Sequence, residues 1–241
     1  MVMCINFIGE IIGKSVKVGV IVFPGSNCDR DMFHVLTDVF NMNTQYYWHE
    51  KGLPNNIDAV ILPGGFSYGD RLRAGIIAAN SPVIDDVKKL ANQGIPILGV
   101  CNGFQILVES NLLPGVLLKN ESLNFMCEWT NLIVKNNKTP FTNKLKFNQK
   151  IPIPIANGEG RYFADSQLLR ELKLHDQIVF TYENYVNGST EQIAGICSED
   201  GNVVGMMPHP ERAAERLLNP IDNRPSSLIF ESLLNMIGVK N

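Results

Sequence analysis

Cys101 lies in a segment whose residue types and spacing favour nucleophilic chemistry. Apolar residues 95–100 lead into Gly-Val-Cys-Asn-Gly, and apolar residues then recur at helical spacing over 104–108. This order predicts a strand, a sharp turn with Cys101 at its tip, and a helix. The flanking glycines allow close strand–helix approach and a strained backbone at the cysteine, as at a nucleophile elbow. An alternative is that Cys101 is a small buried apolar residue, and the turn alone leaves both interpretations open.

A thiol nucleophile needs a base, and His209 is the best placed of the four histidines. It follows apolar residues 203–207 and lies in a Pro-His-Pro-Glu segment. The prolines favour extended backbone, so His209 and Glu211 can project to the same side. The carboxylate can then orient one imidazole nitrogen while the other faces the thiol, which predicts a triad of Cys101, His209 and Glu211. The alternative is a proline-rich turn with a solvated histidine and glutamate.

Backbone N–H groups near Cys101 can supply an oxyanion hole. Pro-Gly-Gly follows the apolar residues 57–62, so the N–H of Gly65 is free of side-chain obstruction at a strand end. Asn102 contributes the N–H that begins the helix after the nucleophile. A phosphate cradle at residues 64–69 is the competing interpretation, but no Gly-Lys-Ser/Thr follows and the chain has no Gly-x-Gly-x-x-Gly motif.

The elements that must position these residues alternate between strands and helices in the first half and are mainly strands in the second. Strands followed by helices favour a parallel sheet whose carboxyl strand ends bind ligands. We therefore predict one α/β domain, flavodoxin-like and doubly wound, with a mostly parallel central sheet, helices on both faces and an antiparallel extension from the C-terminal half. Residues 136–150 are expected to form an exposed loop and 226–237 a closing amphipathic helix. The predicted strands are 17–23, 44–48, 57–62 and 95–100, then 129–135, 151–155, 178–181, 193–196 and 203–207.

Composition excludes several classes of protein. The 241 residues are 45% hydrophobic and 19% charged, as expected for one large globular domain. A net charge of -3 gives no basic footprint for nucleic acid or an anionic membrane, and no apolar run reaches the roughly 20 residues of a membrane span. Five scattered cysteines without a Cys-x-x-Cys pair predict no disulfide framework, no metal site and a cytoplasmic location. Residues 1–15 are interpreted as an N-terminal extension preceding a domain of residues 16–241.

Three motifs together resemble the class I glutamine amidotransferases: residues 99–105, Pro-Gly-Gly at 63–65 and Pro-His-Pro-Glu at 208–211. Within that family, residues 63–70 and 72–75, 158–162 and 208–212 resemble the glutaminase subunits of phosphoribosylformylglycinamidine synthases. The likeness runs from about residue 16 to the C-terminus and leaves out residues 1–15.

The resemblance implies that Cys101 attacks the side-chain amide of L-glutamine, ammonia leaves, and water hydrolyses the γ-glutamyl thioester. It assigns His209 as acid and base, Glu211 as its orienting carboxylate, and the amides of Gly65 and Asn102 as the oxyanion hole. The implied substrate contacts are Gly64, Phe66, Gln105, Gly158 and Glu159. Asn157 departs from the family, which usually has histidine there, and this puts a side-chain role for that position in doubt.

The resemblance also implies partners. Such subunits carry no cofactor and pass ammonia to a large ATP-dependent synthetase subunit, where ATP and Mg²⁺ bind, often with a small third subunit. The product pathway is de novo purine biosynthesis, in which phosphoribosylformylglycinamide becomes phosphoribosylformylglycinamidine. Three alternatives remain: a stand-alone cysteine hydrolase of a related elbow family, the glutaminase subunit of another amidotransferase, and a non-catalytic binding subunit.

Overall fold

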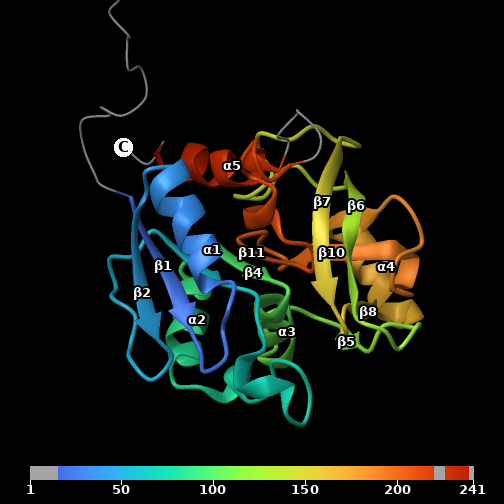
Figure 1. Cartoon of the computed structure of the whole chain (residues 1–241), viewed down its shortest axis with the longest axis horizontal. Coiled ribbons are helices and arrows are strands. Elements are labelled where there is room, and N and C mark those ends of the chain that lie inside the picture. Colours follow the sequence, from blue (N-terminus) through green and yellow to red (C-terminus); the bar gives the residue numbers. More distant parts are fainter. Residues whose placement is uncertain (1–15, 220–225, 239–241) are drawn as a thin grey trace, which may run out of the picture.

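The chain folds around a nine-stranded sheet that is parallel on one side and antiparallel on the other (Figure 1). The computed structural model describes residues 16–219 and 226–238, so the predicted extension at residues 1–15 lies outside the described residues. The strand order is β2-β1-β3-β4-β11-β10-β9-β6-β7, and β5 and β8 form a separate two-stranded sheet. The strands are β1 Lys17–Val22, β2 Asn43–Trp48, β3 Ala59–Leu62, β4 Ile97–Val100, β5 Val116–Leu118, β6 Met126–Val134, β7 Lys150–Asn157, β8 Arg161–Phe163, β9 Ile178–Tyr182, β10 Ile193–Cys197 and β11 Val203–Met206.

The predicted α/β architecture is confirmed, with one correction at β11. Strands β2, β1, β3 and β4 are parallel neighbours, as their apolar sequences indicate. We expected residues 203–207 in the antiparallel extension, but β11 runs parallel to β4, and only its other neighbour, β10, is antiparallel to it. All four residues of β11 are buried. A short apolar strand of this kind does not specify its partner by its pattern, so the sheet order decides its direction.

Helices cover both faces of the parallel strands, and their bounds are α1 Asp29–His34, α2 Val83–Asn92, α3 Asn102–Glu109, α4 Ser166–Leu174 and α5 Ser227–Gly238. Helix α1 continues into a π-helical turn, Val35–Val39. Because crossover connections are right-handed, the reversal of direction between β1–α1–β2 and β3–α2–β4 places α1 and α2 on opposite faces. Figure 1 shows α5 beside α1, and the rings of Phe40 and Phe230 meet there with centroids 5.4 Å apart. The predicted closing helix is therefore confirmed as α5.

Several segments of the second half differ from the sequence predictions, including the unpredicted strands β5 and β8, which pair with each other. The expected exposed loop at residues 136–150 buries Phe141 and Leu145, which are 1% and 3% exposed. Its Asn143 Nδ2 donates to the carbonyl of Ser232 at 2.9 Å, so this segment packs against α5. Helix α4 was not predicted; Asp165 caps it by accepting from two backbone N–H groups. The apolar residues of the 136–150 segment are isolated in a polar stretch and show no periodicity, whereas α4 carries a helical signal, Leu168, Leu169 and Leu172 after the Asp165 cap, that the prediction missed.

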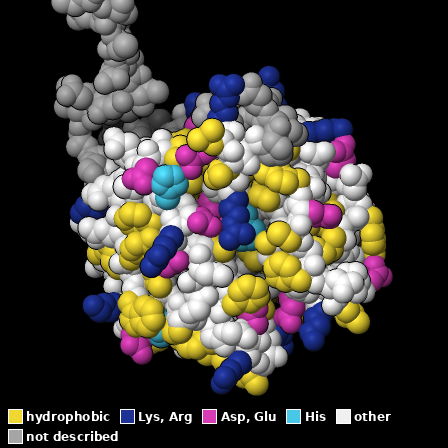
Figure 2. Space-filling view, viewed as in Figure 1, with side chains coloured by type: hydrophobic (Ala, Val, Ile, Leu, Met, Phe, Trp, Pro, Cys, Tyr) yellow, Lys and Arg dark blue, Asp and Glu magenta, His cyan; other side chains and the backbone are white. Residues whose placement is uncertain are grey.

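The surface seen in Figure 2 mixes charged and apolar side chains. Lys and Arg side chains lie among Asp and Glu side chains on this face, with apolar side chains between them. Within residues 16–219 and 226–238, the helices lack the combination of length and apolar character that crossing a bilayer requires.

Candidate active site

Cys101 occupies the turn between β4 and α3, as predicted, and its backbone is strained. Its φ of 50° and ψ of -106° lie outside the regions that L-residues normally adopt. Close packing makes this turn possible: a Cβ on Gly103 would lie 1.9 Å from the carbonyl oxygen of Leu62. A Cβ on Gly99 would lie 2.5 Å from a methyl of Leu107. The glycines therefore let α3 approach the sheet, and the turn has the geometry of a nucleophile elbow.

His209 and Glu211 form a buried pair directly after β11. The imidazole Nδ1 and the carboxylate Oε1 are 2.6 Å apart, and each residue is 1% exposed. Cys101 N donates to the Met206 carbonyl at 2.8 Å, so the parallel pairing of β4 and β11 holds the ends of both strands together. A Cβ on Gly64 would lie 2.7 Å from His209 Cε1 and 3.3 Å from Cys101 Cβ. The imidazole and the thiol-bearing residue therefore meet beside Gly64.

The free nitrogen of His209 is available for a proton. Within the described residues, Nε2 is buried and has no hydrogen-bond partner, while the Cys101 thiol donates to the Ala156 carbonyl at 3.6 Å. Burial alone would lower the pKa of His209, but the charges of Glu211 and Cys101 outweigh burial and raise that pKa well above its usual value. This electrostatic setting favours an imidazolium beside the sulfur, which is what a base needs after it has taken a thiol proton.

The oxyanion hole stays a prediction, and the structure describes the surroundings of its two residues: Gly65 lines the pocket that contains Cys101, and Asn102 directly follows Cys101. Gly65 has φ of 144°, and a Cβ there would lie 2.8 Å from the backbone N of Asn27, so only glycine fits. Asn102 is the first residue of α3, where N–H groups have no intrahelical acceptor. The Asn102 side chain links the Ser67 loop to α3. Its Oδ1 accepts from Ser67 N at 3.1 Å, and its Nδ2 donates to Gln105 Oε1 at 2.9 Å.

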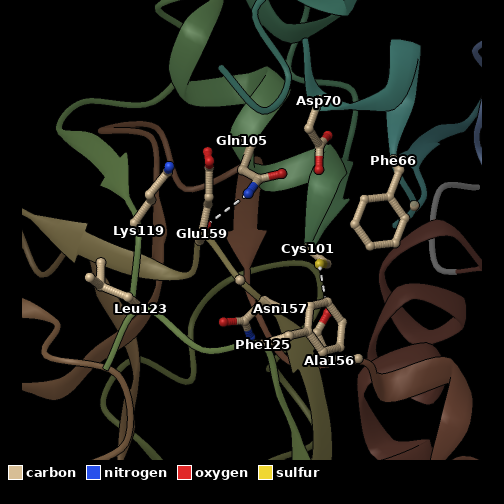
Figure 3. A pocket seen from close by; sticks show the side chains of 12 residues that line it. Phe66, Asp70, Cys101, Gln105, Lys119, Leu123, Phe125, Ala156, Asn157 and Glu159 are labelled. Carbon is tan, nitrogen blue, oxygen red and sulfur yellow. Dashed lines mark hydrogen bonds between the residues drawn. The ribbon is translucent and has the colours of Figure 1, made fainter. Parts of the chain in front are cut away.

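A pocket of about 260 Å³ opens next to Cys101 (Figure 3). Of the predicted substrate contacts, Gly64 is absent from the lining and the other four line the pocket. Gln105 joins two walls, because its Nε2 donates to the carbonyl of Glu159 at 2.7 Å. The rings of Phe66 and Phe125 stack with centroids 6.2 Å apart. The lining residues are Gly65, Phe66, Asp70, Cys101, Gln105, Lys119, Leu123, Phe125, Ala156, Asn157, Gly158 and Glu159.

Sequence reasoning missed several pocket residues. Asp70 lies in the 63–70 segment, but the sequence of this segment does not indicate where the carboxylate points. Lys119, Leu123 and Phe125 come from the connection between β5 and β6, which carries no recognisable motif. No local signal could have placed that connection against Cys101, because the sheet order brings the two together.

Asn157 lies in the pocket wall with its amide unsatisfied. The residue is 3% exposed, and within the described part of the chain neither its Oδ1 nor its Nδ2 has a hydrogen-bond partner. Its backbone carbonyl accepts from Asn120 Nδ2 at 2.8 Å, so the main chain is fixed independently of the side chain. A buried amide without partners costs free energy unless a ligand or water completes it.

Cys28 is a second thiol beside the His209–Glu211 pair and was not predicted. Its sulfur, a His209 nitrogen and a Glu211 oxygen lie within 4.8 Å of one another, and these are atom types that bind zinc. Arg212 Nη2 donates to the Cys28 sulfur at 3.0 Å, and this guanidinium charge opposes a cation at the cluster. Burial raises the pKa of the Cys28 thiol despite the nearby His209 and Arg212. The absence of a metal site stays a prediction.

The fold and the site define an α/β protein with a cysteine nucleophile elbow, a buried His–Glu pair and a pocket at the carboxyl ends of parallel strands. The chain belongs to the CobB/CobQ-like glutamine amidotransferase domain family, whose model matches residues 15–236.

Comparison with individual proteins agrees with this membership. The chain is 49% identical over 234 residues to phosphoribosylformylglycinamidine synthase subunit PurQ of Salinibacter ruber, covering 93% of this chain and 98% of that protein. A chain in the structure of PurLQS from Thermotoga maritima matches with a TM-score of 0.83 and 45% identity, over 93% of this chain and 100% of that chain. A further glutamine amidotransferase structure from Thermotoga maritima matches over 95% of this chain and 100% of that chain, with a TM-score of 0.63. At 17% identity it supports the fold alone.

Proposed function

We propose that this chain is the glutaminase subunit of a phosphoribosylformylglycinamidine synthase. The observation that carries the proposal is the placement of Cys101, on a strained elbow, beside the buried His209–Glu211 pair at the wall of an open pocket. The likeness to PurQ along nearly the whole of both chains supports the particular assignment over another amidotransferase or a stand-alone hydrolase.

In this proposal the reaction proceeds through a thioester. His209 takes the thiol proton as Cys101 sulfur bonds to the side-chain amide carbon of L-glutamine, and the N–H groups of Gly65 and Asn102 stabilise the oxyanion. The carbon–nitrogen bond breaks, and the proton from His209 leaves with ammonia. Water then adds to the thioester, the carbon–sulfur bond breaks, and glutamate is released with the thiol restored. Glu211 holds the imidazole orientation throughout.

The partner in this proposal is a large ATP-dependent synthetase subunit, with a small third subunit and with ATP and Mg²⁺ bound on the synthetase. The support is the similarity to a chain of the PurLQS structure from Thermotoga maritima. The chain itself is proposed to need no cofactor and to work in the cytoplasm.

The test is reconstitution of the full-length chain with the synthetase, followed by assay with glutamine or with ammonium as the nitrogen donor. In the Cys101→Ala variant we expect the glutamine-dependent synthesis to fall by at least about 10³-fold while ammonium-dependent synthesis stays unchanged, because the nucleophile is lost and the synthetase is intact. Equal loss with both donors, or full glutamine-dependent synthesis in the variant, would refute the proposal.

A further inference from the structure

Two thiols, those of Cys28 and Cys101, lie next to the same imidazole. A Cβ built on Gly64 would lie 3.3 Å from both Cys28 Sγ and Cys101 Cβ. The same position is 2.7 Å from Cε1 of the His209 ring. The Cys28 sulfur and the Cys101 Cβ are therefore no farther apart than twice 3.3 Å. Both thiols also raise the pKa of His209, which agrees with their closeness to its ring.

The main chain holds Cys28 at this place. Cys28 N donates to the Gly64 carbonyl at 3.3 Å, and Ser26 forms an antiparallel β-bridge with Gly65. The turn before α1 is thereby attached to the loop that follows β3. A side chain at position 64 would collide with the imidazole and press on both cysteines. Glycine at this position therefore leaves the space to the two thiols and the ring.

The two thiols differ in their access to solvent. Cys101 lines the pocket of about 260 Å³, whereas Cys28 is absent from that lining and is 3% exposed. A small oxidant that enters the pocket therefore meets Cys101 first. Oxidation follows exposure and thiolate character, and Cys101 is the thiol for which His209 is proposed to act as the base.

Arg212 suits Cys28 to react in a second step. Its Nη2 donates to the Cys28 sulfur at 3.0 Å, and its Nε donates to Asp31 Oδ2 at 3.2 Å, so an ion pair holds the guanidinium. Burial raises the pKa of the Cys28 thiol, although His209 and Arg212 act in the opposite direction. Cys28 therefore stays protonated in the resting protein, and the guanidinium charge stabilises the thiolate when its proton leaves.

We propose that Cys101 and Cys28 form a reversible disulfide when a hydroperoxide enters the pocket, with Cys101 as the oxidised thiol and Cys28 as the resolving thiol. This inference goes beyond the proposed function, because it makes the elbow a redox modification site that stops ammonia release. Sulfur atoms in a disulfide are about 2 Å apart, so the Cys101 side chain must leave the Ala156 carbonyl. That contact is 3.6 Å long (Figure 3), and a bond of this length is weak and costs little to break.

The two steps balance with hydrogen peroxide as the oxidant. His209 takes the proton of Cys101, the sulfur bonds to one peroxide oxygen, the oxygen–oxygen bond breaks, and the leaving hydroxide takes that proton and departs as water. Cys101 is then a sulfenic acid. The Cys28 sulfur next bonds to the Cys101 sulfur, the sulfur–oxygen bond breaks, and the hydroxide leaves as water with the proton that Cys28 gave to His209. Two thiols lose two electrons, and one peroxide is reduced to two waters.

The test is peroxide oxidation of the full-length wild-type chain, followed by mass spectrometry. Free thiols are blocked with N-ethylmaleimide, and the chain is digested without reductant. We expect a pair of peptides joined through Cys28 and Cys101, lighter by two hydrogen atoms than the separate peptides. Reconstituted with untreated synthetase, the oxidised chain should lose at least about tenfold in glutamine-dependent synthesis and regain it after dithiothreitol, while ammonium-dependent synthesis stays unchanged.

Cys28→Ser removes the resolving thiol and keeps a small polar side chain beside Arg212. Without that thiol, the Cys101 sulfenic acid is oxidised further to a sulfinic acid, which dithiothreitol does not reduce. We expect recovery to be at least about fivefold lower than in the wild type, each chain being compared with its own untreated activity. Cys197→Ser is the matched control and should recover like the wild type, because Cys197 is also a buried thiol whose pKa is raised by burial.

The outcomes separate the two proposals. A wild-type chain that leaves Cys101 unmodified, oxidises it to a sulfinic acid, or links it to a cysteine other than Cys28 would overturn the thiol pair and leave the glutaminase proposal intact. This measurement depends on no variant. A chain that carries the link between Cys28 and Cys101 yet keeps its glutamine-dependent synthesis would instead refute the proposed function, because a bonded Cys101 sulfur cannot act as the nucleophile.

Discussion

His209 shows how one side chain depends on its neighbours for its chemistry. Burial disfavours its charged form, yet the carboxylate of Glu211 at 2.6 Å, together with Cys101, outweighs burial and raises the pKa of His209. His34 offers a natural comparison, because Asp38 and Glu215 raise its pKa at an exposed position. The same type of ion pair therefore exists in this chain with and without burial.

Glu211→Gln is expected to lower the pKa of His209, because the carboxylate charge that raises it is removed while burial stays. Glutamine hydrolysis by the complex should fall by about 10² to 10⁴-fold, the usual contribution of an acid–base group. NMR titration of labelled histidines measures the pKa, and a steady-state assay measures the rate. Glu215→Gln is the matched control and should move only the His34 signal. An unchanged His209 titration in Glu211→Gln would contradict the assigned role of this pair.

At neutral pH the ionised Asp70 carboxylate is expected to lower the free energy of unfolding of the protein. Its pKa is raised from 3.8 to about 6 in the folded state, so the folded chain keeps its proton to higher pH than the unfolded chain. The penalty is absent below pH 3.8, grows between 3.8 and about 6, and is complete above that. Asp70→Asn should therefore stabilise the fold by about 1 to 2 kcal/mol above pH 6, a figure reduced for partial solvent screening, and by little at pH 4.

Urea unfolding at several pH values tests this prediction. Asp200→Asn serves as the control, because it removes an exposed carboxylate of the same type. The prediction fails if the gain of Asp70→Asn is the same at pH 4 and pH 8, since the pH dependence identifies the ionisation as the cause.

At the scale of elements, the elbow depends on how closely α3 lies against β3. Gly103→Ala would place a methyl group 1.9 Å from the Leu62 carbonyl oxygen, which is backbone and has no rotamer to change. We expect a loss of about 2 to 4 kcal/mol in the free energy of unfolding, measured by urea titration. Gly238→Ala is the control, because nothing lies within 4 Å of its Cβ position. Equal stability of the two variants would mean that α3 can move away from β3 without cost.

At the scale of the whole molecule, large apolar side chains are exposed to solvent at the mouth of the pocket. Leu123 and Phe125 are 79% and 54% exposed, and Phe66 is 46% exposed. These three residues line the pocket that contains Cys101, so the mouth of this pocket is open to solvent in the isolated chain. Exposed apolar groups at a functional opening are typical of a surface that another protein covers.

We therefore expect weak glutaminase activity from the isolated chain and at least about tenfold stimulation when the synthetase and its substrates are added. Coupling has a physical reason, because ammonia released to water at neutral pH is largely protonated and unreactive. The rate of glutamate formation, with and without the synthetase, measures the effect. A rate that is high and independent of the synthetase would show that the two activities are not coupled.

The sequence by itself was sufficient to predict the strand–turn–helix at Cys101 and the alternating strands and helices of the first half, while the chemistry at Cys101 was predicted only from the combination of three motifs and the family that they resemble. Glycine spacing, apolar periodicity and the proline-flanked histidine are local features, and local features are encoded within a few residues of each other. The sequence also placed the His–Glu pair directly after an apolar strand, which the structure contains as β11. It gave the wrong direction for β11, because a four-residue apolar strand has no preference for its partner.

The tertiary structure alone decided which of these parts meet. Parallel pairing of β11 with β4 brings His209 to Cys101, and the connection after β5 supplies Lys119 to the pocket. The same folding brings Asp70 and Glu159 to one pocket, where burial and then the charge of Glu159 raise the pKa of Asp70. Charge interactions and pocket shape depend on distances between segments that are remote in sequence, and only the order of strands in the sheet fixes those distances.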